Sequence, residues 1–326
     1  MVIENVKSFE GQHCETTATG TLLYQLNIEF SEPMLFGLGQ GLSFIFWNMK
    51  TMDFPFIGGR VKPDVLTENI AKNLNCKLIV NETSSKQKAW DNVKELIDKG
   101  QITGLKLDSY YLEYFSEPIH FAGHYVAIYG YDDKYAFLVD TKPNGCKVKT
   151  SLKSLSLARS EKGPMSSKNL YYTLQKTDKN FDLNTAIIAA IRNNANEYLN
   201  PPISNISYKG IFKTSSEIIK WFKQSKNIKN EFKTSAMLME KAGTGGALFR
   251  NLYRDFLKES YELIKLDKIK SAHQAFVEIA GLWTSVSGLF TKVSQTKNIQ
   301  YIQQASDILK TISAKEKSAM EILVQI

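Results

Sequence analysis

Cysteine is scarce in this chain of 326 residues, which contains only Cys14, Cys76 and Cys146. The three lie far apart, form an odd number and include no CxxC pair. This pattern argues against a disulfide framework and against a zinc site, and it is typical of reduced thiols in a cytoplasm. We therefore expect a cytoplasmic protein that holds no structural metal.

Long apolar runs are also missing. No window of about eighteen residues is apolar and free of charge, so we expect no transmembrane helix and no membrane partner. Residues 1–6 lack the basic and apolar regions of a signal peptide. The sequence contains no internal repeat and no low-complexity tract. Its length favours two domains over one.

The net charge of +8 and the pI of about 9.1 raise the question of a nucleic-acid partner. The lysines of residues 220–233, however, are interleaved with apolar residues at helical spacing, and no stripe of arginine with stacking aromatic residues is present. We expect no nucleic-acid partner. A solvated helix face explains these lysines most simply, and a basic surface would equally suit an acidic protein partner.

Two regimes of secondary structure follow one another, with the change near residues 176–182. The first part of the chain shows both strand and helix periodicity. We predict strands at 42–47, 76–80, 102–107, 125–131, 135–139 and 170–174. We predict helices at 15–26, 64–74 and 86–99. The second has helical periodicity alone, at 183–198, 215–224, 229–241, 247–264, 268–293 and 299–312. We predict an α+β protein with domains 1–176 and 177–326, the second an all-α bundle.

The pair His13-Cys14 opens a helix-like run and is the most informative feature of the chain. A thiolate at a helix start is stabilised by unpaired backbone N–H groups and by the positive end of the helix dipole. On this element alone, an ordinary buried thiol at the start of a core helix is the alternative interpretation. Cys76, in a strand-like run, and Cys146, in an expected turn, lack a comparable setting.

His124 and Asp140 supply the partners that such a thiolate needs. His124 leads one expected strand and Asp140 ends the next, with a tight turn at 132–134 between them. Sixteen residues apart in a hairpin, the two side chains can meet, so that the carboxylate orients the imidazole toward Cys14. A satisfied core histidine is the alternative for His124 alone. His120, in the preceding loop, is a secondary candidate, for which an ordinary surface-loop residue is the alternative.

Two residues beside the thiol are candidates for substrate contacts. The side-chain amide of Gln12 could donate to a developing oxyanion together with the backbone N–H of Cys14, unless it is only a polar loop residue. His13 and Cys14 are adjacent in sequence and tend to point apart. We therefore expect His13 to line the substrate cleft rather than to take the proton.

These residues carry a resemblance to the butirosin biosynthesis protein H (BtrH) family over the first 176 residues. The matching motifs are His13-Cys14-Glu15-Thr16-Thr17, the run from Gly123 to Asp133, and Val139-Asp140. The run from Glu240 to Tyr253 resembles the helical C-terminal domain that accompanies this family. The resemblance implies a papain-like cysteine-peptidase fold related to peptidases that trim double-glycine leaders. It also implies Cys14 as nucleophile, His124 as base and Asp140 as the residue that orients it.

The named member of that family is an acyltransferase, which moves an aminoacyl group from a carrier-protein thioester to an amine of an aminoglycoside. The resemblance thus implies a similar transfer in secondary-metabolite (antibiotic) biosynthesis through an acyl-Cys14 intermediate. An acyl carrier protein and a small amine would be the partners. No cofactor is expected on the enzyme, because phosphopantetheine arrives on the donor. The sequence leaves open whether the chain forms a homodimer.

The turn at residues 243–246 adds a second candidate binding feature. With a helix starting at Ala247, Gly245 and Gly246 would present backbone N–H groups to an anion such as the phosphate of phosphopantetheine. Arg250, one turn into that helix, could add a bidentate contact. A glycine C-cap followed by a flexible entry to the next helix is the alternative.

Two other function classes compete with acyl transfer. A peptidase or amidase would use the same Cys-His-Asp set with water as the acceptor, and a binding protein would retain the fold without the chemistry. The complete set of Cys14, His124 and Asp140 argues against the second. Sequence does not separate transfer from hydrolysis, because the pocket determines which acceptor reacts.

Overall fold

The computed structural model describes residues 1–50, 52–116, 118–163 and 166–326, and it divides the chain into two compact units. Unit 1 comprises residues 1–35 and 63–181, and unit 2 comprises residues 36–62 and 182–326. The first division falls within α2 (Glu32–Leu38). The segment 36–62, from the first half of the sequence, is thus part of the helical unit.

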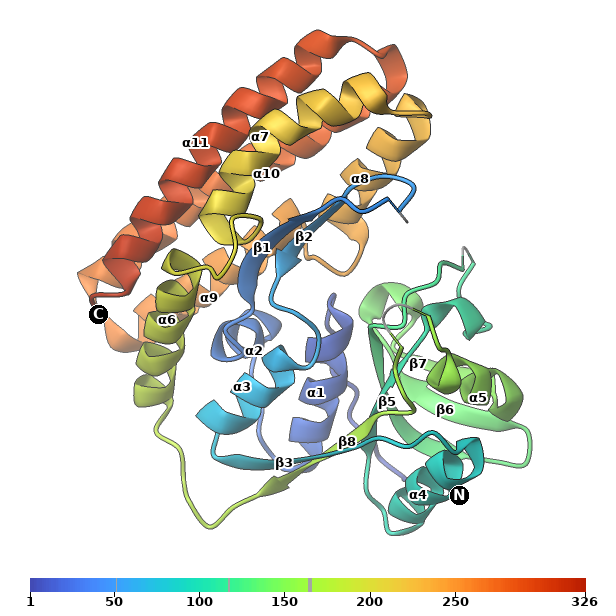
Figure 1. Cartoon of the computed structure of the whole chain (residues 1–326). Helices are drawn as coiled ribbons and strands as arrows, with labels where there is room; N and C mark the ends of the chain where they lie inside the picture. Colours follow the sequence, from blue (N-terminus) through green and yellow to red (C-terminus); the bar gives the residue numbers. More distant parts are fainter. Residues whose placement is uncertain (51, 117, 164–165) are drawn as a thin grey trace. The chain divides into compact units, whose positions relative to one another are not determined.

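Unit 1 is built on a six-stranded antiparallel sheet with the order β3-β8-β4-β5-β6-β7 (Figure 1). The strands are β3 (Cys76–Asn81), β4 (Thr103–Leu107), β5 (His124–Tyr131), β6 (Tyr135–Val139), β7 (Lys147–Ser151) and β8 (Tyr171–Lys176). The helices are α1 (Cys14–Gln25), α3 (Val65–Asn73), α4 (Lys86–Asp98) and α5 (Leu152–Ser160), with the short η1 (Ser109–Tyr111) and η2 (Lys142–Asn144).

The core of unit 1 follows from strand alternation. Val126 and Ile128 of β5 point to one face of the sheet and pack there against Val93 and Ile97 of α4. Helix α1 packs against β5 as well, and its residues from Cys14 to Leu23 are all buried. A helix that is buried on every side needs small residues, and the threonines and glycine after Cys14 provide them.

Unit 2 combines a helical bundle with one strand pair. The helices are α6 (Leu183–Leu199), α7 (Ser207–Gln224), α8 (Ile228–Lys241), α9 (Arg250–Ile264), α10 (Asp267–Thr296) and α11 (Ile299–Leu323), with the short η3 (Ala247–Phe249). Helices α7, α10 and α11 run side by side (Figure 1). Strand β1 (Leu42–Trp47) pairs antiparallel with β2 (Phe56–Arg60) and packs on α7.

The α+β class is confirmed, with sheets formed by the first part of the chain and helices alone after residue 182. Every strand expected from the sequence is present within a residue or two. Within the described residues, β2, β7, α2, α5 and the short η1 and η2 were not expected, α7 begins at Ser207 rather than at residue 215, and α11 continues to Leu323. Among the described residues, no helix has the length and apolar content to cross a membrane.

Candidate active site

Cys14 is the first residue of α1, and the chain before it is held in place by hydrogen bonds. The backbone oxygen of His13 accepts from the Thr16 hydroxyl at 2.9 Å and from the Thr17 hydroxyl at 2.7 Å. It also accepts the Thr17 N–H at 2.9 Å, which is the first helical hydrogen bond. Cys14 itself is only 7% exposed. The sulfur therefore lies at a fixed helix start, where the dipole favours negative charge.

His124 and Asp140 meet in unit 1 as the hairpin spacing predicts. His124 begins β5, and Asp140 follows Val139, which pairs with Ala127 across the ladder. The imidazole Nε2 lies 2.8 Å from Asp140 Oδ2. Both side chains are buried, and the Asp140 carboxylate is additionally held by the Thr141 N–H at 2.6 Å. Such a carboxylate orients an imidazole and stabilises its protonated form.

The same imidazole lies near enough to the Cys14 side chain for that side chain to influence the pKa of His124. Burial by itself lowers the pKa of His124, but the charges of Asp140 and Cys14 and the hydrogen bonds to both raise it to about 10. Burial would raise the pKa of Asp140, and the neighbouring imidazolium with three hydrogen bonds holds it below its usual value. The three residues thus form one electrostatically coupled group.

Two aromatic residues that the sequence analysis did not select complete this group. The Tyr114 hydroxyl donates to Asp140 Oδ2 at 2.7 Å. The Phe115 ring meets the His124 ring edge to face, with centroids 5.5 Å apart and planes at 87°. Both come from the loop between β4 and β5. The aromatic run Tyr110, Tyr111, Tyr114 and Phe115, next to the histidine strand, was the available signal.

Gln12 and His13 lie at the start of α1 beside the partly buried carboxylate of Glu32. Glu32 accepts the Gln12 N–H at 2.8 Å, the His13 N–H at 2.8 Å and the Thr16 hydroxyl at 2.8 Å. Burial raises the pKa of Glu32, although these donors oppose the shift. The Gln12 side chain is exposed beside Cys14, whereas His13 is 4% exposed. Glu32 therefore fixes the backbone that leads into the thiol.

His120 forms a separate pair with Asp108. Its Nδ1 lies 2.9 Å from Asp108 Oδ2, and its ring stacks on Tyr110 at 3.8 Å between centroids. Asp108 is 2% exposed and also accepts the N–H groups of Tyr110 and Phe121. The His120 side chain, by contrast, is 59% exposed. The interaction of His120 with Asp108 holds the two ends of the loop between β4 and β5 close together.

Arg250 is not a ligand-binding residue in this structure, contrary to the expectation from sequence. Its guanidinium is completely buried in unit 2 and forms a bidentate pair with Glu316, with both N–O distances at 2.9 Å. The remaining Nη1 donates to the backbone oxygens of Gly59 and Leu248. The Trp283 ring lies below the cation at 4.9 Å. Every donor nitrogen of the side chain is thus used inside the unit.

Gly245 and Gly246 do not form an anion cradle, and the physical reason is local. Helix α9 begins at Arg250, not at Ala247, because residues 247–249 all have positive φ angles of 49° to 73°. The Gly246 N–H is taken by the Thr244 hydroxyl and the Ala247 N–H by the Glu240 carboxylate. A neighbouring carboxylate also repels an anion. The glycines, with φ of 65° and 85°, make a left-handed turn that only they adopt without strain.

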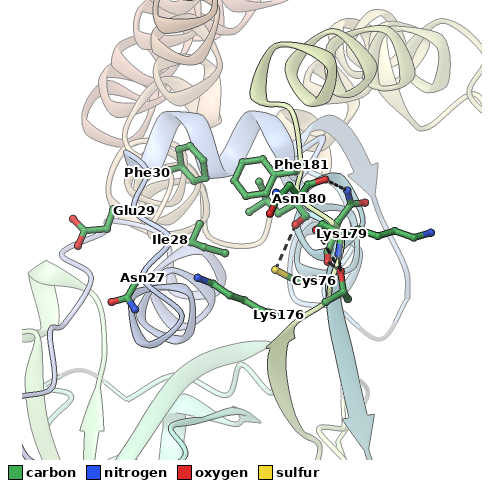
Figure 2. Close-up of a pocket in the computed structure, with 12 residues that line it drawn as sticks. Asn27, Ile28, Glu29, Phe30, Cys76, Lys176, Lys179, Asn180 and Phe181 are labelled. Atoms are coloured by element: carbon green, nitrogen blue, oxygen red, sulfur yellow. Dashed lines mark hydrogen bonds between the residues drawn. The ribbon is translucent and has the colours of Figure 1, made fainter.

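Cys76 occupies a quite different environment from Cys14. It lines a hollow of about 360 Å³ at the other end of α1, together with Ile28, Phe181 and Lys176 (Figure 2). Its thiol donates weakly to the Leu74 backbone oxygen at 3.6 Å. Burial raises the pKa of the Cys76 thiol. A raised pKa makes this cysteine a poorer nucleophile at neutral pH, so it provides an internal reference for Cys14.

Family comparisons agree with the motifs. Residues 13–141 match the family described as butirosin biosynthesis protein H, N-terminal, a segment that begins just before Cys14 and ends just after Asp140. Residues 153–323 match a domain of unknown function, DUF4872. No curated protein matches the chain. Within the described residues, no group of three or more His, Cys, Asp or Glu side chains could hold a metal ion. The chain belongs to the DUF4872 family, whose model covers its C-terminal region, and its N-terminal region matches the model of butirosin biosynthesis protein H.

Proposed function

We propose that this protein is a cysteine-dependent acyltransferase of secondary-metabolite biosynthesis, in which unit 1 is a papain-like domain. It would move an acyl or aminoacyl group from a carrier-protein thioester to an amine through an acyl-Cys14 intermediate. The observation that carries the proposal is the contact of Cys14, His124 and Asp140 in one buried group. A cysteine at a helix start, facing a histidine on an antiparallel strand, also supports the papain-like assignment.

In the first half-reaction, the Cys14 thiolate attacks the carbonyl carbon of the donor thioester. A new S–C bond forms, and the carbonyl electron pair moves to oxygen. The exposed amide of Gln12 and the Cys14 N–H at the helix start are the proposed donors to that oxyanion. When the tetrahedral adduct collapses, the donor C–S bond breaks and the His124 imidazolium gives its proton to the departing pantetheine thiolate. Thioester exchange is nearly balanced in free energy, so a thiolate and an oxyanion site suffice.

In the second half-reaction, an amine attacks the acyl-Cys14 thioester. Its nitrogen forms the amide bond, His124 takes the proton released by that nitrogen, and the Cys14 thiolate departs. Acylation prepares His124 for this role. The thiolate charge is one cause of the raised His124 pKa of about 10, and the acyl group removes that charge. The imidazole of the acyl-enzyme therefore loses its proton more readily and becomes a usable base.

A basic surface on unit 2 supports an acidic carrier protein as the donor. Lys229, Lys233 and Lys241 follow one another at intervals of four and eight residues along α8, and all three are exposed. The last turn of α7 adds the exposed Lys223, and the turn between α7 and α8 adds the exposed Lys226. Positive charge of this kind speeds encounter with a negatively charged partner. The carrier would bring phosphopantetheine with it, so the enzyme itself needs no cofactor.

Acyl-pantetheine thioesters of varied chain length test the proposal directly. The wild-type protein is mixed with each donor, and its intact mass is measured before and after a primary amine is added. We expect the mass of one acyl group on Cys14, absent from Cys14→Ser, and its transfer to the amine. Acylation that persists in Cys14→Ser contradicts the proposal, and so does a wild-type protein that none of the donors acylates. Loss of the acyl group to water at the same rate with and without amine identifies a hydrolase instead.

A further inference from the structure

Tyr114 and Phe115, in the loop between β4 and β5, contact both members of the His124–Asp140 pair. The Tyr114 hydroxyl is bonded to Asp140 Oδ2 at 2.7 Å, and this is the same oxygen that faces His124 Nε2 at 2.8 Å. The rings of Tyr114 and Phe115 touch, with centroids 5.1 Å apart, and Phe115 lies against the imidazole. One dipeptide thus contacts the carboxylate and the imidazole at once.

The position of Tyr114 is fixed by its neighbours on the loop. The Glu113 carboxylate accepts both the N–H and the hydroxyl of Ser151, each at 2.8 Å. Leu112 is buried in the core between the sheet and α5. At the base of the loop, Asp108 accepts the N–H groups of Tyr110 and Phe121. A phenol held this way keeps its oxygen on Asp140 without needing the substrate to order it.

The Tyr114 phenol acts only as a hydrogen-bond donor. Burial and the adjacent Asp140 charge raise its pKa well above the usual value, with a further contribution from Cys14. It therefore remains protonated at every physiological pH. A donor on Oδ2 takes up part of the carboxylate's negative charge. Less of that charge is then available to hold the proton on His124.

We propose that Tyr114 is a positioning residue for the reaction, which orients Asp140 and moderates its hold on the His124 proton. The inference rests on the proposed function of Cys14, His124 and Asp140 and extends it to a fourth side chain. Acyl transfer needs an imidazole that gives up its proton in one half-reaction and accepts one in the other. Without the hydrogen bond from Tyr114, the full negative charge of Asp140 would stabilise protonated His124 and hinder the release of its proton. Because the phenol shares that charge, His124 can both donate and accept a proton.

The pH dependence of Cys14 alkylation by iodoacetamide tests this role, with Tyr114→Phe compared against Tyr111→Phe. Tyr111 lies in the same loop, but its hydroxyl donates to Glu161 at 2.7 Å, so it is a matched control. Without the phenol, Asp140 holds the His124 proton more tightly. We expect the alkylation midpoint of Tyr114→Phe to move about half a pH unit or more to lower pH. We expect Tyr111→Phe to superimpose on the wild type.

The same variant should turn over acyl-pantetheine and amine about fivefold more slowly, with an unchanged KM for the thioester, because proton transfer and not binding is affected. Incorporation of 3-fluorotyrosine at position 114, a stronger donor of the same shape, should move the midpoint to higher pH. This graded variant keeps the test valid if Tyr114→Phe unfolds. A purely structural role predicts lower thermal stability with no shift in either direction, and that result overturns the inference.

The two proposals fail in distinguishable ways. A wild-type Cys14 that reacts like an ordinary thiol, with no selectivity over Cys76, contradicts the proposed function itself. A selective wild-type Cys14 whose pH profile is unchanged in both variants at position 114 contradicts only the role of Tyr114.

Discussion

Each unit of this protein contains a buried pair of opposite charge, and these two pairs differ in whether they can exchange a proton. In unit 2, Arg250 and Glu316 are fully buried and bidentate, and arginine does not deprotonate in proteins. In unit 1, Asp140 is fully buried and the His124 side chain is only 8% exposed, but an imidazole can titrate, and this one also interacts with Cys14. Burial of a charge pair therefore indicates a reactive site only where one member can change its protonation state.

The two pairs also differ in how completely other groups of the protein use their hydrogen-bonding capacity. Glu316 accepts from Arg250, from the Trp283 indole at 2.8 Å and from the Tyr198 hydroxyl. This network joins β2, η3 and the four helices α6, α9, α10 and α11, and it uses every nitrogen of the Arg250 side chain. Asp140 is surrounded by an equally dense hydrogen-bond network, but that network also reaches the Cys14 side chain through His124. The predictions below separate the reactive pair from the structural one, in order of decreasing expected effect.

Asp140→Asn should reduce acyl transfer the most. The amide cannot hold the imidazolium or fix the ring tautomer, so we expect kcat/KM for an acyl-pantetheine thioester to fall by roughly a hundredfold or more. Steady-state kinetics measure this. Asp108→Asn is the matched control, because Asp108 is also buried beside a histidine in the same unit. Equal losses in both variants would mean that neither carboxylate has a special role.

Glu316→Gln should instead destabilise the fold. It leaves the buried Arg250 cation without its charge partner, and we expect the free energy of unfolding to fall by about 3 kcal/mol. Urea unfolding followed by circular dichroism measures the change. Glu321→Gln, which removes an exposed partner of Lys317, should cost less than about 1 kcal/mol. Alkylation of Cys14 in folded Glu316→Gln should stay within about twofold of the wild type, and a large drop would contradict a purely structural pair.

Glu32→Gln should have the smallest effect. The Glu32 carboxylate binds the backbone just before Cys14, where its negative charge opposes a thiolate. A neutral side chain of the same shape should shift the Cys14 alkylation midpoint to lower pH by a few tenths of a unit. Stopped-flow alkylation over a pH series resolves a shift of this size. A shift to higher pH would show that Glu32 acts by ordering the helix start rather than by its charge.

The sequence predicted the contact of His124 with Asp140 but not that of Arg250 with Glu316. His124 and Asp140 lie on adjacent strands of a hairpin, so alternation and turn length suffice to bring them together. Arg250 was assigned to a ligand because its partner Glu316 lies 66 residues further along the chain, beyond any local pattern. Tyr114 was missed for a similar reason, since its contact depends on the path of an irregular loop.

The unexpected strands have local explanations. Strand β2 contains Gly58 and Gly59, which have low strand propensity, and it forms because the Gly59 backbone meets Arg250 and η3 inside unit 2. Strand β7 alternates lysine with Val148 and Thr150 at the edge of the sheet, a pattern that also fits a polar loop. In segments whose own sequence favours a strand only weakly, tertiary contacts determine whether the strand forms.

The most direct test of the central claim is the rate at which each cysteine reacts with iodoacetamide between pH 5.5 and pH 10, followed by peptide mass spectrometry. A thiolate–imidazolium pair predicts that Cys14 is modified at least about tenfold faster than Cys76 and Cys146 at pH 6.5. Its rate should stay nearly level until His124 loses its proton near pH 10. Equal modification of the three cysteines, or a Cys14 rate that rises about tenfold per pH unit from pH 6 to 8, would contradict the account.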